Sequence, residues 1–256
     1  MTRPLIMGVL NITPDSFSDG GQYNTPELAL QQAMELLADG ADILDVGGES
    51  TRPGAARVSV DVEIARVVPV IEQIRFLGLP ISIDTMNAAT AEAAVQAGAT
   101  IINDVSGGLN DPEIFDVAAK HEVTLIISHW RGHSDRMDEL TTYQDVAKDV
   151  TRELQKQVEL ARAAGVTKLV IDPGLGFAKN VDQNWELLEN LHELKTLGLP
   201  ILIGASRKRF IAARLAEDTV AARDEATAYL MGDLMAKHNL WGFRVHNVKA
   251  TRARQN

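Results

Sequence analysis

The hydrophobic positions of this chain fall into eight short apolar runs, and each run ends in polar residues capable of chemistry. In order, the runs are LIMGVLN (5–11), ADILDVGGES (41–50), PISIDT (80–85), TIINDV (100–105), TLIISHW (124–130), KLVIDPG (168–174), PILIGASRK (200–208) and GFRVHNV (242–248). Parallel strands buried on both faces have this apolar character. A barrel built from eight of them gathers its catalytic residues where the strands end. The pattern therefore predicts a (β/α)8 barrel with a site at the carboxyl ends of its strands.

Helical patterns that stop at a glycine separate these runs. We predict helices over 25–38, 60–76, 87–97, 143–164 and 182–197, and after the seventh run a short extra helix precedes a longer one over 223–237. A glycine shortly after a helix commonly ends it. The composition does not change along the chain, so we predict α/β class and one barrel domain over residues 1–256. A doubly wound open sheet is the alternative, but eight units and the lack of a GxGxxG fingerprint weigh against it.

Composition and charge narrow the function classes. The chain has 256 residues, of which 45% are hydrophobic and 23% charged, as in an ordinary globular domain. It has no cysteine, which excludes disulfides and a thiolate nucleophile. No apolar run approaches the roughly 20 residues that span a bilayer, so we expect a cytoplasmic protein without a membrane partner. The net charge of −10 argues against a nucleic-acid partner.

The candidate site has the opposite charge balance from the chain as a whole. Lys208, Arg244 and His246 lie at run ends, and Arg52 lies in a long loop (47–59) after the second run. An Arg fork can bind two phosphate oxygens at once, although an isolated Arg is more often a solvated surface residue. Phosphate sites in barrels form after strands 7 and 8, beside a short extra helix. We therefore predict an anion site here, the alternative for Lys208 being the polar start of a helix.

Asp84, Asn103 and Asp172 end the third, fourth and sixth runs. Buried carboxylates and amides need partners, because without them each costs several kcal/mol. A ligand with adjacent N–H donors, such as an aminopyrimidinone, would satisfy them. Capping of neighbouring loops is the structural alternative for each one.

Asn11 and Asp45 are oxygen donors suited to a hard cation such as Mg²⁺. His129 is interpreted as a satisfied core histidine, with a ligand-lining role as the alternative. The chain lacks the His and Cys cluster of a zinc site and any evident Ser-His-Asp arrangement. The residues therefore favour electrostatic over covalent catalysis.

Taken together, the ordered motifs resemble dihydropteroate synthases of folate biosynthesis, particularly the actinobacterial form. The matching stretches are MGVLNITPDSFSDGG, DVGGESTRPGA, ISIDT, INDVSGG, SHWRG, DPGLGFAKN, GASRKRFI and RVHNV, from Met7 to Val248. The resemblance implies condensation of 6-hydroxymethyl-7,8-dihydropterin pyrophosphate with 4-aminobenzoate, releasing pyrophosphate, by an SN1-like route. It also implies Mg²⁺, a homodimer and a sulfonamide target. A weakly active or non-catalytic pterin-binding paralogue is the alternative.

The resemblance also implies roles for individual residues. The pterin would be held by Asp84, Asn103, Asp172 and Lys208, and the pyrophosphate by Asn11, Arg52, Arg244 and His246, with Asn11 also at the metal. The 4-aminobenzoate pocket would be framed by Thr51, Pro53, Phe17, Phe177 and Ser206, the first three in mobile loops that also contain Asp15 and Ser16. Asp84, Arg52, Lys208 and Asp172 are the expected catalytic residues.

The chain departs from the family pattern in three places. Asn247 stands where an Asp commonly follows the His, Trp130 replaces a frequent Met, and Ala178 replaces a frequent Gly. The segment after the eighth run, 249–256, is also shorter than the usual last helix. These departures are expected to affect the surroundings of His246 and the dimer surface.

Overall fold

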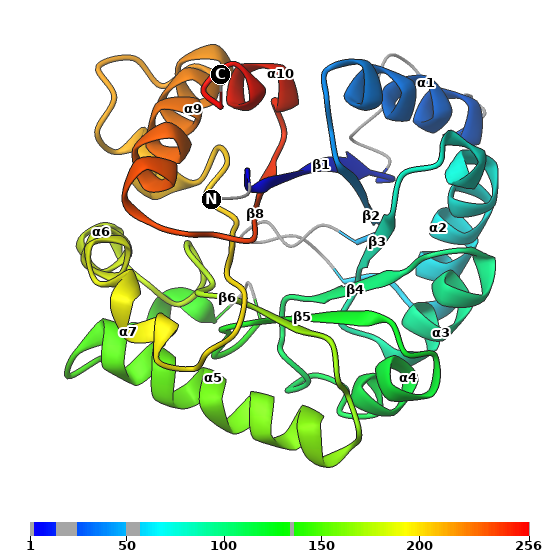
Figure 1. Cartoon of the computed structure of the whole chain (residues 1–256), viewed down its shortest axis with the longest axis horizontal. Coiled ribbons are helices and arrows are strands. Elements are labelled where there is room, and N and C mark those ends of the chain that lie inside the picture. The colour runs from blue at the N-terminus through cyan, green and yellow to red at the C-terminus, as the bar shows by residue number, and fades with distance from the viewer. Residues whose placement is uncertain (1–2, 14–24, 50–56, 134–135, 256) are drawn as a thin grey trace.

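The computed structural model describes residues 3–13, 25–49, 57–133 and 136–255, and in these parts eight parallel strands form a nearly closed barrel (Figure 1). The strands are β1 (Leu5–Asn11), β2 (Ile43–Gly47), β3 (Ile81–Asp84), β4 (Ile101–Asp104), β5 (Thr124–Ser128), β6 (Leu169–Asp172), β7 (Leu202–Ile203) and β8 (Gly242–Val245). Their order is β6-β5-β4-β3-β2-β1-β8-β7, and a bridge between Ile171 and Ile201 links the two outer strands. The predicted (β/α)8 barrel is confirmed.

Helices surround the strands on the outside (Figure 1). They are α1 (Thr25–Ala38), α2 (Val60–Ile74), α3 (Ala88–Ala97), α4 (Ile114–Lys120), α5 (Val146–Ala163), α6 (Val181–Glu189), α7 (Leu191–Lys195), α8 (Arg209–Ala212), α9 (Val220–Lys237) and α10 (Val248–Arg252). Side-chain caps begin several of them: the α6 cap is Asn180, whose side chain accepts from Gln183 N while the Gln183 side chain accepts in return. None of the helices in the described parts of the chain is both long and apolar enough to span a bilayer.

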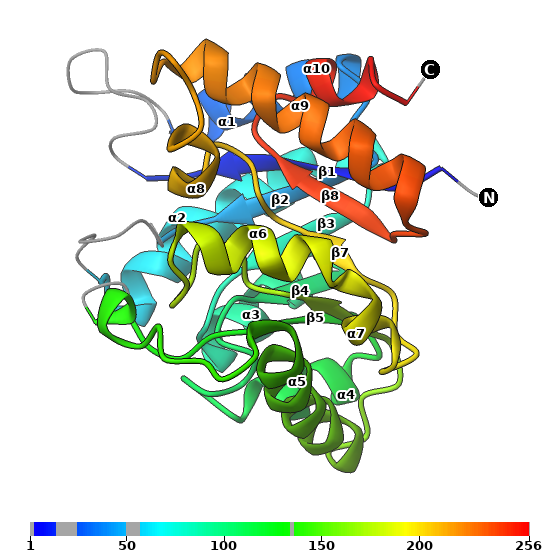
Figure 2. The same cartoon turned by 90° about the vertical axis from the view of Figure 1, so that its left-hand side faces the viewer.

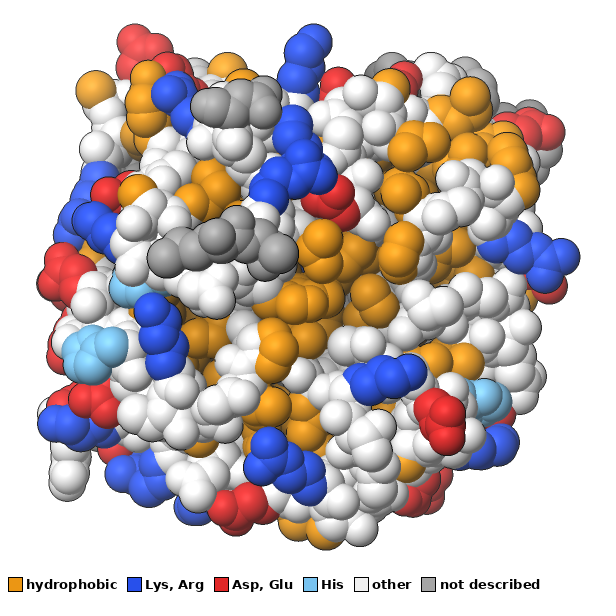
Figure 3. Space-filling view, viewed as in Figure 1, with side chains coloured by type: hydrophobic (Ala, Val, Ile, Leu, Met, Phe, Trp, Pro, Cys, Tyr) orange, Lys and Arg blue, Asp and Glu red, His pale blue; other side chains and the backbone are white. Residues whose placement is uncertain are grey.

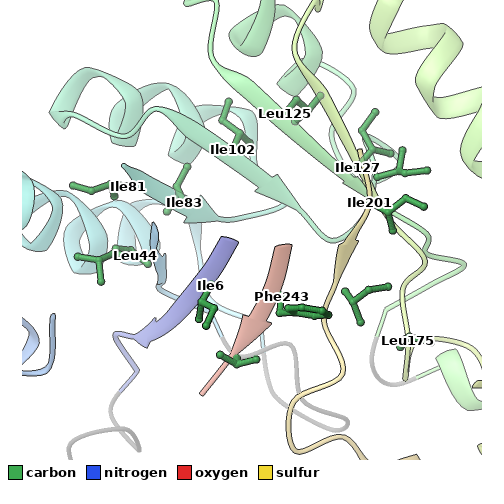
Figure 4. Packing of buried hydrophobic residues seen from close by; sticks show 14 of the residues in the cluster. Ile6, Leu44, Ile81, Ile83, Ile102, Leu125, Ile127, Leu175, Ile201 and Phe243 are labelled. Atoms are coloured by element: carbon green, nitrogen blue, oxygen red, sulfur yellow. The ribbon is translucent and has the colours of Figure 1, made fainter. Parts of the chain in front are cut away.

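The larger apolar cluster lies between the strands and the helices. Figure 4 shows side chains from it, among them Ile6, Leu44, Ile83, Ile127 and Phe243, each of which is fully buried. These residues alternate along the strands with residues of the opposite face, which point into the barrel. The outer layer therefore fixes which side chains face inward.

The barrel interior has an apolar layer at the amino ends of the strands. The layer consists of Met7, Ile43, Ile101, Ile126, Val170 and Leu202, and the partly buried Leu5 and Trp241 pack against it. Figure 3, which looks onto these strand ends, shows hydrophobic side chains in the middle of the face. The ends of the described chain lie on this side, while α8 lies on the opposite side (Figure 2).

Polar residues of the interior follow the apolar ones by two positions, as the period of a strand requires. Pairing places Asp45 beside Ser82, Asp84 beside Asn103, and Met7 beside Arg244. The same register brings Asn11 level with Gly47, and Gly47 level with Asp84. Charged and amide groups from β1 to β4, β6 and β8 therefore converge at the carboxyl ends of the strands.

Candidate active site

Arg244 connects two carboxylates inside the barrel. Its Nε donates to Asp45 at 2.5 Å, and its Nη2 donates to Asp84 at 2.7 Å. Although burial works against the charge, the two carboxylates raise the pKa of Arg244 above its usual value. Asn103 Nδ2 lies 3.4 Å from Asp45 Oδ2 and adds a further contact. These four side chains form a charged and hydrogen-bonded layer directly above the apolar one.

Asp84 has an oxygen that nothing in the described parts of the chain satisfies. Burial raises the pKa of Asp84 to about 7, against the lowering effect of Arg244. Arg244 binds Oδ2, whereas Oδ1 is buried without a hydrogen-bond partner among the described residues. A buried acceptor without a donor is costly, so a bound ligand with an N–H group would stabilise it.

Two glycines leave room beside the acidic residues. A methyl group on Gly47 would lie 3.6 Å from Asn11 Oδ1 and 3.6 Å from Asp84 Oδ2. A methyl group on Gly204 would lie 3.1 Å from Asp172 Oδ2. Because neither glycine has a side chain, nothing at these two positions crowds the carboxylates of Asp84 and Asp172.

Asp172 and Lys208 lie on the other side of the interior. Burial raises the pKa of Asp172, and the nearby Lys208 and a bond from Gly174 N at 2.7 Å oppose that rise. Burial lowers the pKa of Lys208 to about 8, while Asp172 works in the opposite direction. The Lys208 ammonium donates to the Leu175 carbonyl and lies 4.5 Å from the centre of the Phe177 ring. Lys208 therefore faces the interior and is more than the polar start of α8.

Ser206 and His246 are joined at the ends of β7 and β8. Ser206 Oγ lies 3.1 Å from His246 N, which donates to it, and 3.0 Å from His246 Nδ1. The next residue, Arg207, has a φ of 59°, a left-handed conformation that is uncommon outside glycine. The Arg207 side chain donates two hydrogen bonds, of 2.6 and 2.8 Å, to the carboxylate of Asp224 in α9.

Asn247, one of the departures from the family pattern, has a structural place next to this pair. Its Oδ1 accepts from Ala250 N at 2.9 Å and caps α10, and its Nδ2 donates to Asp224 Oδ2 at 3.3 Å. The amide thus satisfies a helix end and a carboxylate together, which an Asp side chain could not do when ionised.

Sequence reasoning was wrong about Asp45 as a donor for a cation. Asp45 is fully buried, and Arg244 and Asn103 occupy its oxygens. Within the described ranges, no three His, Asp or Glu side chains group in a way that could hold a metal. Asn11, at the mouth near Asp84, offers one amide oxygen, and this fits an ion held mainly by ligand phosphates and water.

The predicted site residues divide into two groups. Asn11, Asp84, Asn103, Asp172, Phe177, Ser206, Lys208, Arg244 and His246 all lie at the carboxyl ends of the strands or in the loops that follow them. Phe17, Thr51, Arg52 and Pro53, with Asp15 and Ser16, lie outside the described residues. The structure therefore brings the first group together at one end of the barrel, and the roles of these residues stay predictions.

Sequence reasoning missed the partners that hold this site together. Arg244 was assigned only to an anion, yet its contacts are Asp45 and Asp84. Lys179 was also missed, although it is nearly fully buried and contacts His129. A lysine directly before a helix N-cap suggests an exposed side chain, so only the fold reveals it. His129, 2% exposed, is confirmed as a satisfied core residue.

The arrangement suits a flat polar ligand that carries an anionic group. Carboxylates and an amide face a lysine across the interior, so one edge of a heterocycle would find acceptors and the other a cation. Arg244 and His246 lie at the adjoining strand end, where they could stabilise negative charge.

Comparison with known proteins shows which families and structures this chain is similar to. The pterin binding enzyme family matches residues 7–246. A dihydropteroate synthase of Mycobacterium leprae is 48% identical over 253 residues, which is 96% of this chain and 89% of the relative. The dihydropteroate synthase structure of Xanthomonas albilineans with 4-aminobenzoic acid has a TM-score of 0.91 and 41% identity, covering 99% of this chain and 91% of that one.

A second solved structure contains 6HMPPP in place of 4-aminobenzoic acid. The dihydropteroate synthase of Thermus thermophilus, in complex with 6HMPPP, has a TM-score of 0.85 and 37% identity over 99% of this chain and 92% of that chain. The barrel, the order of its motifs and these likenesses over nearly the whole length lead to one conclusion. The chain belongs to the dihydropteroate synthase family of pterin-binding transferases in folate biosynthesis.

Proposed function

We propose that this chain condenses 6-hydroxymethyl-7,8-dihydropterin pyrophosphate with 4-aminobenzoate, giving 7,8-dihydropteroate and pyrophosphate. The observation that carries the proposal is the buried polar layer at the strand ends, where Asp84 Oδ1 has no partner among the described residues. Family membership supports the reaction, and the two ligand-bound relatives support its substrates.

The pterin would bind in this layer. Its aminopyrimidinone edge presents adjacent N–H donors, which a carboxylate accepts in the same way as it accepts an Arg fork. We assign this edge to Asp172 and the remaining ring nitrogens to Asp84 and Asn103. Lys208, which faces Asp172 and carries a positive charge below its pKa of about 8, would donate to the pterin carbonyl or ring nitrogen.

The pyrophosphate would lie at the mouth, beside Asn11, Arg244 and His246, with Arg52 added from the second loop. Positive and hydrogen-bonding groups that meet negative charge as it develops on a leaving group lower the barrier to departure. Asn11 is the residue we propose to hold Mg²⁺ together with the pyrophosphate oxygens. When bound, this ion would neutralise charge on the leaving group.

Departure of pyrophosphate would leave a cation on the pterin methylene carbon. The buried carboxylates of Asp84 and Asp172 favour positive charge next to them, so they would stabilise this cation. The nitrogen lone pair of the 4-aminobenzoate amine then attacks this carbon, and the resulting ammonium loses one proton to water or to the released pyrophosphate, so no strong base is needed. We place its ring near Phe177 and Ser206 within the described chain.

Thr51, Pro53 and Phe17 complete the proposed 4-aminobenzoate pocket. We also propose a homodimer in the cytoplasm, and inhibition by sulfonamides, which resemble 4-aminobenzoate. These proposals rest on the family resemblance.

The deciding experiment measures pyrophosphate release by the purified protein with both substrates, with and without Mg²⁺. We expect release only when both substrates are present, and much faster release with Mg²⁺. Arg52→Ala should lower kcat/KM by about a hundredfold, as loss of one oxyanion-stabilising donor does, without changing thermal unfolding. Folded protein that releases no pyrophosphate would refute the proposed reaction.

A further inference from the structure

Lys179 is a buried lysine outside the residues assigned to the reaction. It lies between β6 and α6 and is 7% exposed. Its Nζ donates to the carbonyls of Gly174, at 3.0 Å, and Phe177, at 3.1 Å, and lies 2.9 Å from His129 Nδ1. An amine in such a place is costly unless every hydrogen is used, and here three acceptors surround three possible donors.

The contacts around His129 decide where the protons are. Arg131 donates to both oxygens of Glu153, at 3.0 and 2.6 Å. Although burial opposes it, bonds from His129 and Arg131 lower the pKa of Glu153 to about 2, so this residue is ionised. His129 Nε2, 2.9 Å from Glu153 Oε2, must then donate the bond.

Burial and the charge of Lys179 lower the pKa of His129 to about 3, so the imidazole is neutral and its Nδ1 is an acceptor. Lys179 must therefore supply the hydrogen to Nδ1 as well as those to the two carbonyls. All three bonds require an ammonium group. Burial and the nearby charge of Lys208 lower the pKa of Lys179 well below its usual value, while the negative charges of Asp172 and Glu153 oppose that shift.

The loop held by Lys179 is the one that serves the site. The carbonyl of Leu175, between the two that Lys179 holds, accepts from Lys208. Phe177, whose carbonyl Lys179 also holds, places its ring 4.5 Å from the Lys208 ammonium. Gly174 donates to Asp172 at 2.7 Å. The carbonyls of one short loop thus accept from two lysines, the buried Lys179 and the partly buried Lys208.

Lys179 also affects the charge of the site. Besides Lys208 and Arg244, it is the third cation whose charge lowers the pKa of Asp172. The charged groups that face Lys179 itself are Lys208, Asp172, Arg131 and Glu153. Removal of Lys179 would leave Asp172 more easily protonated.

We propose that Lys179 is a positioning residue for the transfer reaction: supported by His129 and Glu153, it fixes the 174–177 loop that places Lys208, Phe177 and the Gly174 N–H that donates to Asp172. This inference rests on the proposed function for its kinetic consequences. Its structural part, the clamped loop, is independent of the reaction.

Two substitutions separate the clamp from the charge. Lys179→Met removes the donors and the charge, while Lys179→Gln keeps two amide donors for the carbonyls and removes the charge and the third donor, which faces His129. Lys195→Met, at an exposed position at the end of α7, is the matched control. Each variant is measured for pyrophosphate release per active site, for the pH profile of kcat/KM, and for amide hydrogen exchange over residues 173–180.

We expect Lys179→Met to lower kcat/KM for 4-aminobenzoate by roughly a hundredfold, as misplacement by about 1 Å does, and to speed exchange in the loop. Both variants should move the acid limb of the pH profile upward, because Asp172 then titrates at higher pH. If Lys179→Met does not fold, the pH profile of Lys179→Gln decides the question of charge.

Wild-type exchange rates and a wild-type pH profile in the folded variants would overturn the proposal, because a merely structural lysine would alter only the yield of folded protein. If the wild-type protein itself releases no pyrophosphate, the proposed function fails. The exchange experiment still tests the clamp in that case.

Discussion

At the scale of single residues, the protonation of Asp84 decides when the site can accept N–H donors. Burial raises the pKa of Asp84 to about 7 from a usual value near 4, so the acceptor form gains population as the pH rises through 7. A pterin that donates to Asp84 should therefore bind more weakly as the pH falls below 7. Calorimetric titration with 6-hydroxymethylpterin from pH 5.5 to 8 measures this dependence.

The affinity of the Asp84→Asn variant is expected to be the same at every pH in this range, because an amide does not titrate. It should be weaker than that of the wild type at pH 8, because a neutral amide oxygen is a weaker acceptor than a carboxylate. Asp116→Asn, on the exposed face of α4, is the control and should retain the wild-type profile. An affinity of the wild-type protein that stays constant from pH 5.5 to 8 would contradict the assignment of Asp84.

Arg244 provides a second prediction at this scale. Arg244 forms ion pairs with both Asp45 and Asp84, so Arg244→Ala leaves two buried carboxylates without their shared cation. Removing one partner of a buried ion pair costs about 3–5 kcal/mol, so the variant should unfold at clearly lower urea concentration. Arg162→Ala, on the exposed side of α5, should change the urea midpoint little. Equal midpoints for the two variants would refute the connecting role.

Individual site residues were predictable to different degrees. Asp84, Asn103 and Asp172 stand out in the sequence because each directly follows an apolar run. The pairing of Arg244 with Asp84 spans 160 residues and depends on β8 lying beside β1, so no local pattern indicates it. Asp45 has a carboxylate that could bind a cation, but the sequence does not show that Arg244 already donates to this carboxylate.

At the scale of elements, the loop after β6 is expected to tolerate no side chain at Gly174. Its φ is 66°, and a methyl group there would lie 2.0 Å from the His129 carbonyl oxygen. Gly198 has the same φ of 66° with no atom within 4 Å of such a methyl group, which makes it a matched control. Gly198→Ala should cost only the strain of the left-handed conformation, about 1–2 kcal/mol.

Gly174→Ala should cost more, because backbone atoms must move and the bond to Asp172 must break. Thermal unfolding of the two variants measures the difference. Similar melting temperatures would show that the loop yields readily and that its close packing on His129 has little energetic weight.

Most of the helices between the strands were predictable because caps and glycines mark their ends, but α4 (Ile114–Lys120) was not predicted. The predicted helix over 182–197 is wrong in one respect: it divides at Asn190 into α6 and α7. Apolar periodicity continues through this point, since Leu187, Leu188, Leu191 and Leu194 are all buried. The division between α6 and α7 does not interrupt the series of buried leucines, so the hydrophobic pattern of the sequence does not indicate it.

At the scale of the whole molecule, the two ends of the barrel interior have different tasks. The apolar layer at the amino ends contributes packing, while the polar layer at the carboxyl ends contributes chemistry. Ile43→Ala, in the apolar layer, should therefore destabilise the protein by about 2–4 kcal/mol through loss of packing. Its kcat and KM should stay near wild type at temperatures where it remains folded.

Urea unfolding and steady-state kinetics on the same preparation measure both effects. Asn103→Ala, in the polar layer, is the comparison and should raise KM for the pterin substrate. If Ile43→Ala changes KM as strongly, the two layers are not independent.

The barrel class itself was predictable because eight units of one kind follow one another. The way in which it closes was not predictable, since β7 has only two strand residues and meets β6 through a single bridge. Strand pairing of that kind depends on the tilt of the whole sheet, and the run PILIGASRK contains no indication of it.

The glycines beside the carboxylates bear on how this site can change during evolution. Asp84 and Arg244 are tied to other charged groups, so replacing either one alters stability together with binding. Gly47 makes no such bonds, and an added methyl group there meets Asn11 and Asp84 only at ordinary contact distance, 3.6 Å. A substitution at Gly47 can therefore change the shape of the ligand site at little cost in stability. We expect such substitutions under selection for a different ligand shape, for example by an inhibitor that fills this space.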